Sequence, residues 1–230
     1  MTRDPLDDWR VPGWFYDQWE ENNIWRPGEL DVDEKLLASF IRCVDNACDE
    51  RPIHKFLEGA PNLLLGTQRT GHGTWVFSKK KLGSEFIPDF LIASGSSGGL
   101  SWEMVELESP CEIPYLKSGQ PSESLRHGIA QVQDWRAWLS NNKDYAAKPK
   151  SQGGLGLAQI HDQTLGTIII GRRDKSMPDK YNEIRTQIRS QNNISIMTYD
   201  RLLELVATEM LRFSSNEKPH DCVQRLRLAQ

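Results

Sequence analysis

Apolar residues recur at helical spacing in the first regular part of the chain, between residues 34 and 59. One face of the first predicted helix collects the apolar positions Leu36, Leu37, Phe40, Ile41 and Val44. Asp31 precedes Glu34 at the spacing of a capping box. Arg51-Pro52 ends this helix, and the segment PIHKFLEG predicts a short second helix with its proline in the first turn.

The pattern changes to that of strands from Asn62 to Glu108. The runs LLLGTQ and TWVFSK flank Gly71-His72-Gly73, which is a hairpin signal. The runs EFIPDFLIA and WEMVELE follow, separated by the small-residue segment SGSSGGLS. Because sequential strands joined by short turns pair with each other, these runs predict an antiparallel meander.

Helices and strands alternate in the rest of the chain. The segment ESLRHGIAQVQDWRAWLSNN has helical spacing, whereas residues 141–163 are rich in Lys, Gly and Gln and indicate a mobile insertion. Two segments, TLGTIIIGRR and NISIMTY, are apolar enough for buried strands. Two others, PDKYNEIRTQIRSQN and DRLLELVATEMLRF, have helical spacing. Asp200 is the expected cap of the second of these helices. The predicted fold class is α/β: a mixed sheet flanked by helices, in the order helix, antiparallel meander, helix, strand, helix, strand.

The two ends of the chain differ from the middle in composition. Residues 1–33 hold four of the eight tryptophans (Trp9, Trp14, Trp19 and Trp25), set among acidic residues. Large aromatic area stabilises contacts, so we expect this segment to pack on the body of the protein or on another subunit, and we expect a homo-oligomer. The main domain is predicted over residues 34–213, and residues 214–230 are predicted to be a loosely attached polar tail.

Composition and charge exclude several classes of protein. The formal net charge is −4, which argues against non-specific coating of nucleic acid but permits a locally basic cleft. The chain has neither a transmembrane run nor a secretory signal, so we expect a cytoplasmic protein without a membrane partner. Its four cysteines show no zinc-ligand spacing, and no phosphate-binding P-loop motif is present.

Three carboxylates lie close together in the predicted meander. Glu106 and Glu108 are two residues apart and therefore point to the same side of their strand, while Asp89 lies on the preceding strand. Cross-strand neighbours are about 5 Å apart at Cβ, and like charges at that range repel unless a cation neutralises them. The pattern favours a Mg²⁺ or Mn²⁺ site. The alternative is a strip of solvent-facing acids on an edge hairpin.

Pro88-Asp89 followed by Glu106-Leu107-Glu108 resembles the PD-(D/E)XK nuclease signature. The ordered segments FLEGAPNLL, PDFLIA, MVELESP, GIAQVQDWRAWL, IIIGRR and ISIMTYDRLLEL resemble, over roughly residues 50 to 206, the nuclease domain of Shedu antiphage proteins. The resemblance implies a restriction-endonuclease-like fold and a metal-dependent DNA endonuclease acting in antiphage defence, with DNA as its partner.

The resemblance also implies roles for individual residues. Asp89 and Glu106 would hold Mg²⁺ or Mn²⁺ together with the backbone carbonyl of Leu107. Gln131 would orient a ligand water, and Glu50 matches less clearly a helix glutamate that some such nucleases use as a further ligand.

The chain departs from this pattern at Glu108, where the family has lysine. A lysine stabilises the charge that develops on the phosphate, whereas a glutamate can bind a second cation or accept a proton. Lys117 or one of Lys79, Lys80 and Lys81 is an alternative source of positive charge. The rival interpretation is a catalytically degenerate protein that acts as a DNA-binding or assembly module. A paired-carboxylate glycosidase fits worse, because its two acids flank a sugar-sized cleft.

Overall fold

The computed structural model describes residues 11–25, 32–67, 72–173, 181–211 and 217–229. Contacts divide the chain into two compact units. The first consists of residues 1–29, 69–106 and 130–166, and the second of residues 30–68, 107–129 and 167–230.

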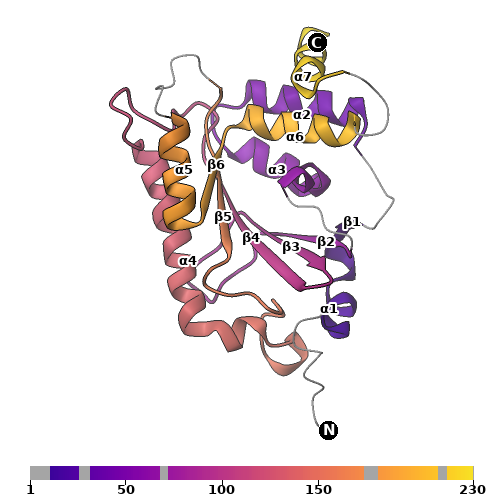
Figure 1. Ribbon diagram of the computed structural model, residues 1–230. Helices are drawn as coiled ribbons and strands as arrows, with labels where there is room; N and C mark the ends of the chain where they lie inside the picture. The colour runs from indigo at the N-terminus through magenta and orange to yellow at the C-terminus, as the bar shows by residue number, and fades with distance from the viewer. Residues whose placement is uncertain (1–10, 26–31, 68–71, 174–180, 212–216, 230) are drawn as a thin grey trace. The chain divides into compact units, whose positions relative to one another are not determined.

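An antiparallel run of strands forms the first unit, together with most of one long helix (Figure 1). Strands β1 (Asn23–Trp25), β2 (Thr74–Ser78), β3 (Phe90–Ser96) and β4 (Gly99–Leu107) pair in chain order. Helix α4 (Glu123–Ala147) is kinked at Asn142; the shorter helices are α1 (Gly13–Gln18), η1 (Glu20–Asn22) and η3 (Lys150–Gln152). The predicted meander is therefore present, built from β2, β3 and β4.

Aromatic side chains form the core of the first unit, and the N-terminal segment contributes to it. Phe15 packs edge-on against Trp75 at 5.1 Å between ring centroids, and Trp19 packs against Phe77 at 4.7 Å. The indole nitrogen of Trp19 donates a hydrogen bond of 2.8 Å to the carbonyl oxygen of Gly156. Trp14 is partly exposed; Trp9 and the side chain of Trp25 lie outside the described residues.

The segment from residue 141 to 163 is packed, although its composition indicated a mobile insertion. Helix α4 continues to Ala147, and Leu157, Ala158 and Ile160 are buried. The indole nitrogen of Trp102 donates to the carbonyl of Ala158 at 2.8 Å. Tryptophans from other segments, Trp19 and Trp102, donate hydrogen bonds to carbonyls of this segment. The polar composition of the segment therefore did not predict its structure.

Helices surround a short pair of strands in the second unit. Its helices are α2 (Glu34–Asn46), α3 (Arg51–Gly59), η2 (Pro61–Thr67), α5 (Tyr181–Asn192), α6 (Tyr199–Leu211) and α7 (Pro219–Leu228). Strand β5 (Leu165–Ile169), whose first two residues belong to the first unit, neighbours β6 (Ile194–Met197), and the amide of Ile170 donates to the carbonyl of Met197 at 3.0 Å. The α/β fold class, with strands flanked by helices in the predicted order, is confirmed.

Several local expectations need correction. The run LLLGTQ falls in the 3-10 helix η2 rather than in a strand, because the adjacent residues Leu63 and Leu64 are both buried, which alternation along a half-buried strand does not allow. Asp31 lies outside the described residues, and the cap of α2 is Asp33, whose carboxylate accepts from the amide of Leu36. The carboxylate of Asp200 binds arginines, while the amide of Arg201 donates to Thr198 Oγ1.

The C-terminal residues also differ from the expected polar tail. Residues 219–228 form α7, and its side chains Cys222, Val223 and Leu226 are buried. Arg227 forms an ion pair with Asp45 of α2 at 2.8 Å. The apolar spacing of this short helix was hidden among many polar residues.

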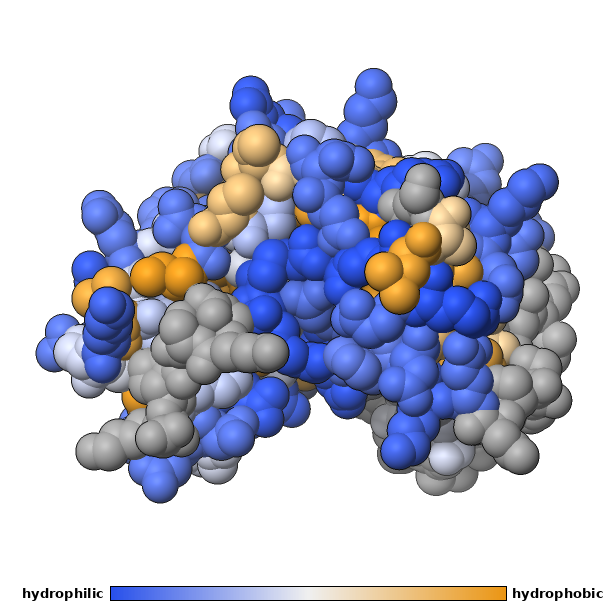
Figure 2. Space-filling view, turned by 90° about the horizontal axis from the view of Figure 1, so that it is seen from above, coloured by the Kyte–Doolittle hydropathy of each residue, from blue (hydrophilic) through white to orange (hydrophobic). Residues whose placement is uncertain are grey.

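The face shown in Figure 2 is mainly hydrophilic, with hydrophobic side chains at scattered positions. In the described part of the chain, no helix combines the length and the apolar character needed to cross a membrane.

Candidate metal centre

Lys79, Asp89 and Glu106 form a row across three neighbouring strands of the first unit. Ser78 pairs with Phe90 and Phe90 pairs with Val105, so extending both registers by one residue places Lys79 opposite Asp89 and Asp89 opposite Glu106. The backbone supports the first step, because the amide of Lys79 donates to the carbonyl of Asp89 at 3.0 Å. Directly opposite side chains share one face of a sheet, so Asp89 and Glu106 lie on the same face, and the ion pair with Asp89 brings the Lys79 side chain to them.

The two carboxylates of the row are buried, and a lysine contacts one of them. Asp89 is 6% exposed and Glu106 is 8% exposed. The ammonium of Lys79 forms an ion pair with Oδ1 of Asp89. Lys79 itself has a φ angle of +48°, a left-handed conformation that is uncommon for residues other than glycine. The turn after β2 therefore holds a strained residue whose side chain reaches Asp89.

This donor set fits a hard divalent cation. Two carboxylates and one ammonium carry a formal charge of −1, and carboxylate oxygens are the hard ligands that such a cation prefers. Mg²⁺ is commonly held by one or two carboxylates with water completing its coordination. Among the described residues, no group of three or more His, Cys, Asp and Glu side chains is placed to hold a metal ion. The candidate ligands within the first unit are the two carboxylates of Asp89 and Glu106.

Gln131 lies in α4, in the part of this helix that belongs to the first unit. Its Oε1 atom is buried and has no hydrogen-bond partner among the described residues. A buried amide oxygen without a partner is costly, and a bound water is the usual remedy. That Gln131 orients a water remains a prediction, and the buried Oε1 atom is suited to accept a hydrogen bond from one.

Glu108 and Glu50 belong to the second unit. The amide of Glu108 donates to the carbonyl of Ile169 at 2.9 Å, and Tyr199 donates its hydroxyl to the carbonyl of Glu108 at 2.8 Å. The Glu108 carboxylate lies 3.4 Å from Nδ1 of His127. Glu50 is partly exposed and precedes the first residue of α3. Metal binding by Glu50 and by Glu108 stays a prediction.

The sequence singled out Lys79 only as one of several possible cations. The signal that identifies it is the register of β2: the lysine follows the last strand residue, Ser78, and the aspartate precedes the first residue of β3. Glu103, which is 2% exposed, is another buried acid of β4. It lies three residues from Glu106, so alternation points it to the opposite face of the strand.

Comparison with known protein families places most of this chain in one of them. The family described as Shedu protein SduA, C-terminal, matches residues 47–203. The match includes the Lys79, Asp89 and Glu106 row, Gln131 and Glu108. Among curated proteins, no match to the chain was found.

Proposed function

This chain belongs to the Shedu protein SduA C-terminal family, an antiphage defence family, and from that premise we propose that it is a metal-dependent DNA endonuclease. The observation that carries the proposal is the row of Lys79, Asp89 and Glu106, which brings two buried carboxylates and a cation to the ends of three adjacent strands. The substrate is a phosphodiester bond of DNA.

Each residue of the row has a distinct task. Asp89 and Glu106 hold Mg²⁺ or Mn²⁺, which supplies a Lewis acid for the phosphate oxygen and an activated water. Lys79 holds Asp89 in place before DNA binds and supplies positive charge to the developing phosphate charge. Gln131 orients a water through its buried Oε1. The nuclease signature has a lysine at the position of Glu108. In this proposal, Lys79 supplies the positive charge that this lysine would provide.

The proposal requires cleavage that depends on both the metal and the acidic pair. Purified protein is incubated with DNA in Mg²⁺ or Mn²⁺ and, in parallel, in EDTA. Cleavage is expected only with the metal, and Glu106→Gln and Asp89→Asn should abolish it. Glu103→Gln is the matched control, because it neutralises another buried acid of the same strand that points to the other face. Circular dichroism establishes that each variant is folded.

The rival function, a DNA-binding or assembly module without catalysis, predicts a different result. DNA binding without turnover and no calorimetric signal on addition of Mn²⁺ would select that function. Cleavage that persists in folded Glu106→Gln would remove Glu106 from the site. Assembly into a homo-oligomer remains part of the proposal, and the mass of the protein in solution measures it.

A further inference from the structure

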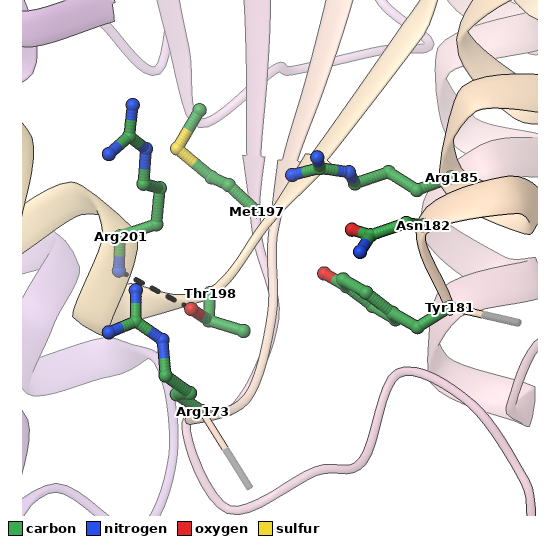
Figure 3. Close-up of a pocket in the computed structure, with 7 residues that line it drawn as sticks. All are labelled: Arg173, Tyr181, Asn182, Arg185, Met197, Thr198 and Arg201. Atoms are coloured by element: carbon green, nitrogen blue, oxygen red, sulfur yellow. Dashed lines mark hydrogen bonds between the residues drawn. The ribbon is translucent and has the colours of Figure 1, made fainter. Parts of the chain in front are cut away.

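A cavity of about 270 Å³ lies within the second unit (Figure 3). Its wall is formed by Arg173 after β5, by Met197, Thr198 and Arg201 around the junction of β6 and α6, and by Tyr181, Asn182 and Arg185 of α5. In Figure 3, the side chains from α5 extend towards β6, and Arg173 and Thr198 lie on the opposite side. The volume is close to the lower end of the roughly 300–1,000 Å³ of small-ligand sites.

The wall of the cavity is positively charged. Among the described residues, its lining contains three arginines and no acidic side chain. Arg173 is neutralised by Glu204, to which it donates two hydrogen bonds of 2.6 and 2.8 Å. Arg201 approaches the same carboxylate only to 3.8 Å, and no carboxylate among the described residues is at ion-pair distance from Arg185. Arg185 and Arg201 therefore leave the cavity with positive charge that a bound anion would offset.

Neutral donors and a helix end add to this preference for an anion. Arg201 lies in the first turn of α6, and a helix N-terminus favours negative charge. Burial raises the pKa of the Tyr181 hydroxyl, and this effect is larger than the lowering by the charges of Arg185 and Arg173. The hydroxyl therefore remains a donor at neutral pH. Guanidinium, phenol and amide groups together are suited to the several oxygens of a phosphate.

Tyr181 also provides an aromatic surface. Its ring packs edge-on against Tyr115, with 5.0 Å between centroids, and the Arg185 guanidinium lies 5.8 Å from its centroid. Tyr115 and Arg185 thus hold the ring at the wall of the cavity. Stacking on such a ring is sequence-tolerant for nucleic-acid bases, because every base has a π-face.

We infer that this cavity is a second phosphate site, which binds the phosphate group of a nucleotide, either free or within a nucleic-acid strand. Arg185 and Arg201 contact the phosphate oxygens, and Tyr181 contacts the sugar or the base. The site uses neither Asp89 nor Glu106, so its occupation does not depend on cleavage or on a divalent metal.

The test compares two arginines of the same helix. Arg185 lines the cavity, whereas Arg189, one turn further along α5, is exposed and outside its wall. Binding of deoxyadenosine monophosphate is measured by calorimetry, and binding of a fluorescent single-stranded oligonucleotide by anisotropy, with the full chain in EDTA. Arg185→Gln should weaken binding by about 10-fold or more, and Arg201→Gln similarly, because each removes charge-assisted hydrogen bonds. Arg189→Gln should change it by less than about twofold.

The two probes separate the sources of the phosphate. Binding of the monophosphate that depends on Arg185 identifies a free nucleotide as a ligand, whereas Arg185-dependent binding of the oligonucleotide alone identifies a strand. Because both probes are measured in EDTA, without the metal that the proposed catalytic site needs, binding that depends on Arg185 separates this site from the catalytic one. The inference is overturned if neither probe binds, if Arg185→Gln binds unchanged, or if Arg189→Gln loses as much affinity.

Discussion

Lys79 forms an ion pair with Asp89 across the ends of β2 and β3. The lysine follows the last residue of one strand and the aspartate precedes the first residue of the next, so the contact is a direct consequence of strand register. On the other side of Asp89, the same register extends to Glu106. One row across three strand ends therefore combines a cation with the two carboxylates that we propose as metal ligands.

Replacing Lys79 should impair cleavage without impairing metal binding. Lys79→Met removes the positive charge that the proposal assigns to the transition state, and we expect a loss of about 10²–10³-fold in cleavage rate, similar to the loss of other electrostatic stabilisers. The affinity for Mn²⁺ should be unchanged or higher, since a competing cation leaves Asp89. Cleavage assays and calorimetry measure the two effects separately.

Lys81→Met is the control for this change, because Lys81 is an exposed lysine two residues along the chain. Its cleavage rate should stay within about twofold of that of the natural chain, as expected for a surface substitution. An equal loss in both lysine variants would show that general attraction of DNA, rather than the contact with Asp89, explains the effect.

A lysine at position 108 should partly restore cleavage to the Lys79→Met protein. Position 108 is two residues from Glu106 and follows the last residue of β4, and it is the position at which the nuclease signature that this chain resembles has lysine. If a single cation near the carboxylates is sufficient, the double variant Lys79→Met/Glu108→Lys should cleave at least about 10-fold faster than Lys79→Met alone. A double variant no faster than Lys79→Met would mean that the two positions are not interchangeable.

The packing of the N-terminal segment predicts a large stability loss for Trp19→Ala. Trp19 is 6% exposed, packs against Phe77 and donates to the carbonyl of Gly156. Truncation should lower the free energy of unfolding by about 3–5 kcal/mol, as for other buried tryptophans. Urea denaturation measures the loss. Tyr16→Ala, a change at a 36% exposed aromatic residue three positions earlier, should lower it by less than half as much.

Strand and helix order could be predicted from the sequence because hydrophobic spacing is a local property. The same reasoning indicated that Asp89 and Glu106 lie on neighbouring strands, and the register agrees. Prediction from local spacing and composition failed where residues distant in the sequence determine the local structure. Trp19 and Trp102 bind carbonyls of residues 156 and 158, and this packing cannot be read from a segment rich in Gly and Lys.

Lys79 illustrates a second limit of the sequence. Three consecutive lysines follow β2, and composition cannot distinguish among them. Only the register shows that the first of them faces Asp89. The cavity between α5 and β6 was missed for a similar reason, since Arg173, Arg185 and Arg201 lie in three separate segments of the chain and carry no common motif.

The arginine network around Asp200 predicts how stability depends on pH. Burial alone would raise the pKa of Asp200, but hydrogen bonds from Arg172, the amide of Arg173 and Arg227 lower it to about 2. Because the folded-state pKa lies below the ordinary value, the ionised carboxylate stabilises the protein above about pH 4, and this stabilisation is lost as the pH falls towards 2. The urea midpoint should therefore decrease steadily over that interval.

Asp200→Asn isolates this contribution. At pH 7 the variant should lose about 2–3 kcal/mol of unfolding free energy, less than the roughly 3–5 kcal/mol of a fully buried ion pair because both arginine side chains keep partial exposure. The variant should also lose less stability than the natural chain between pH 4 and pH 2, since it has no carboxylate to protonate at position 200. Equal acid sensitivity of the two proteins would assign the acid transition to other carboxylates, such as Glu204, whose pKa is lowered mainly by its hydrogen bonds with Arg173.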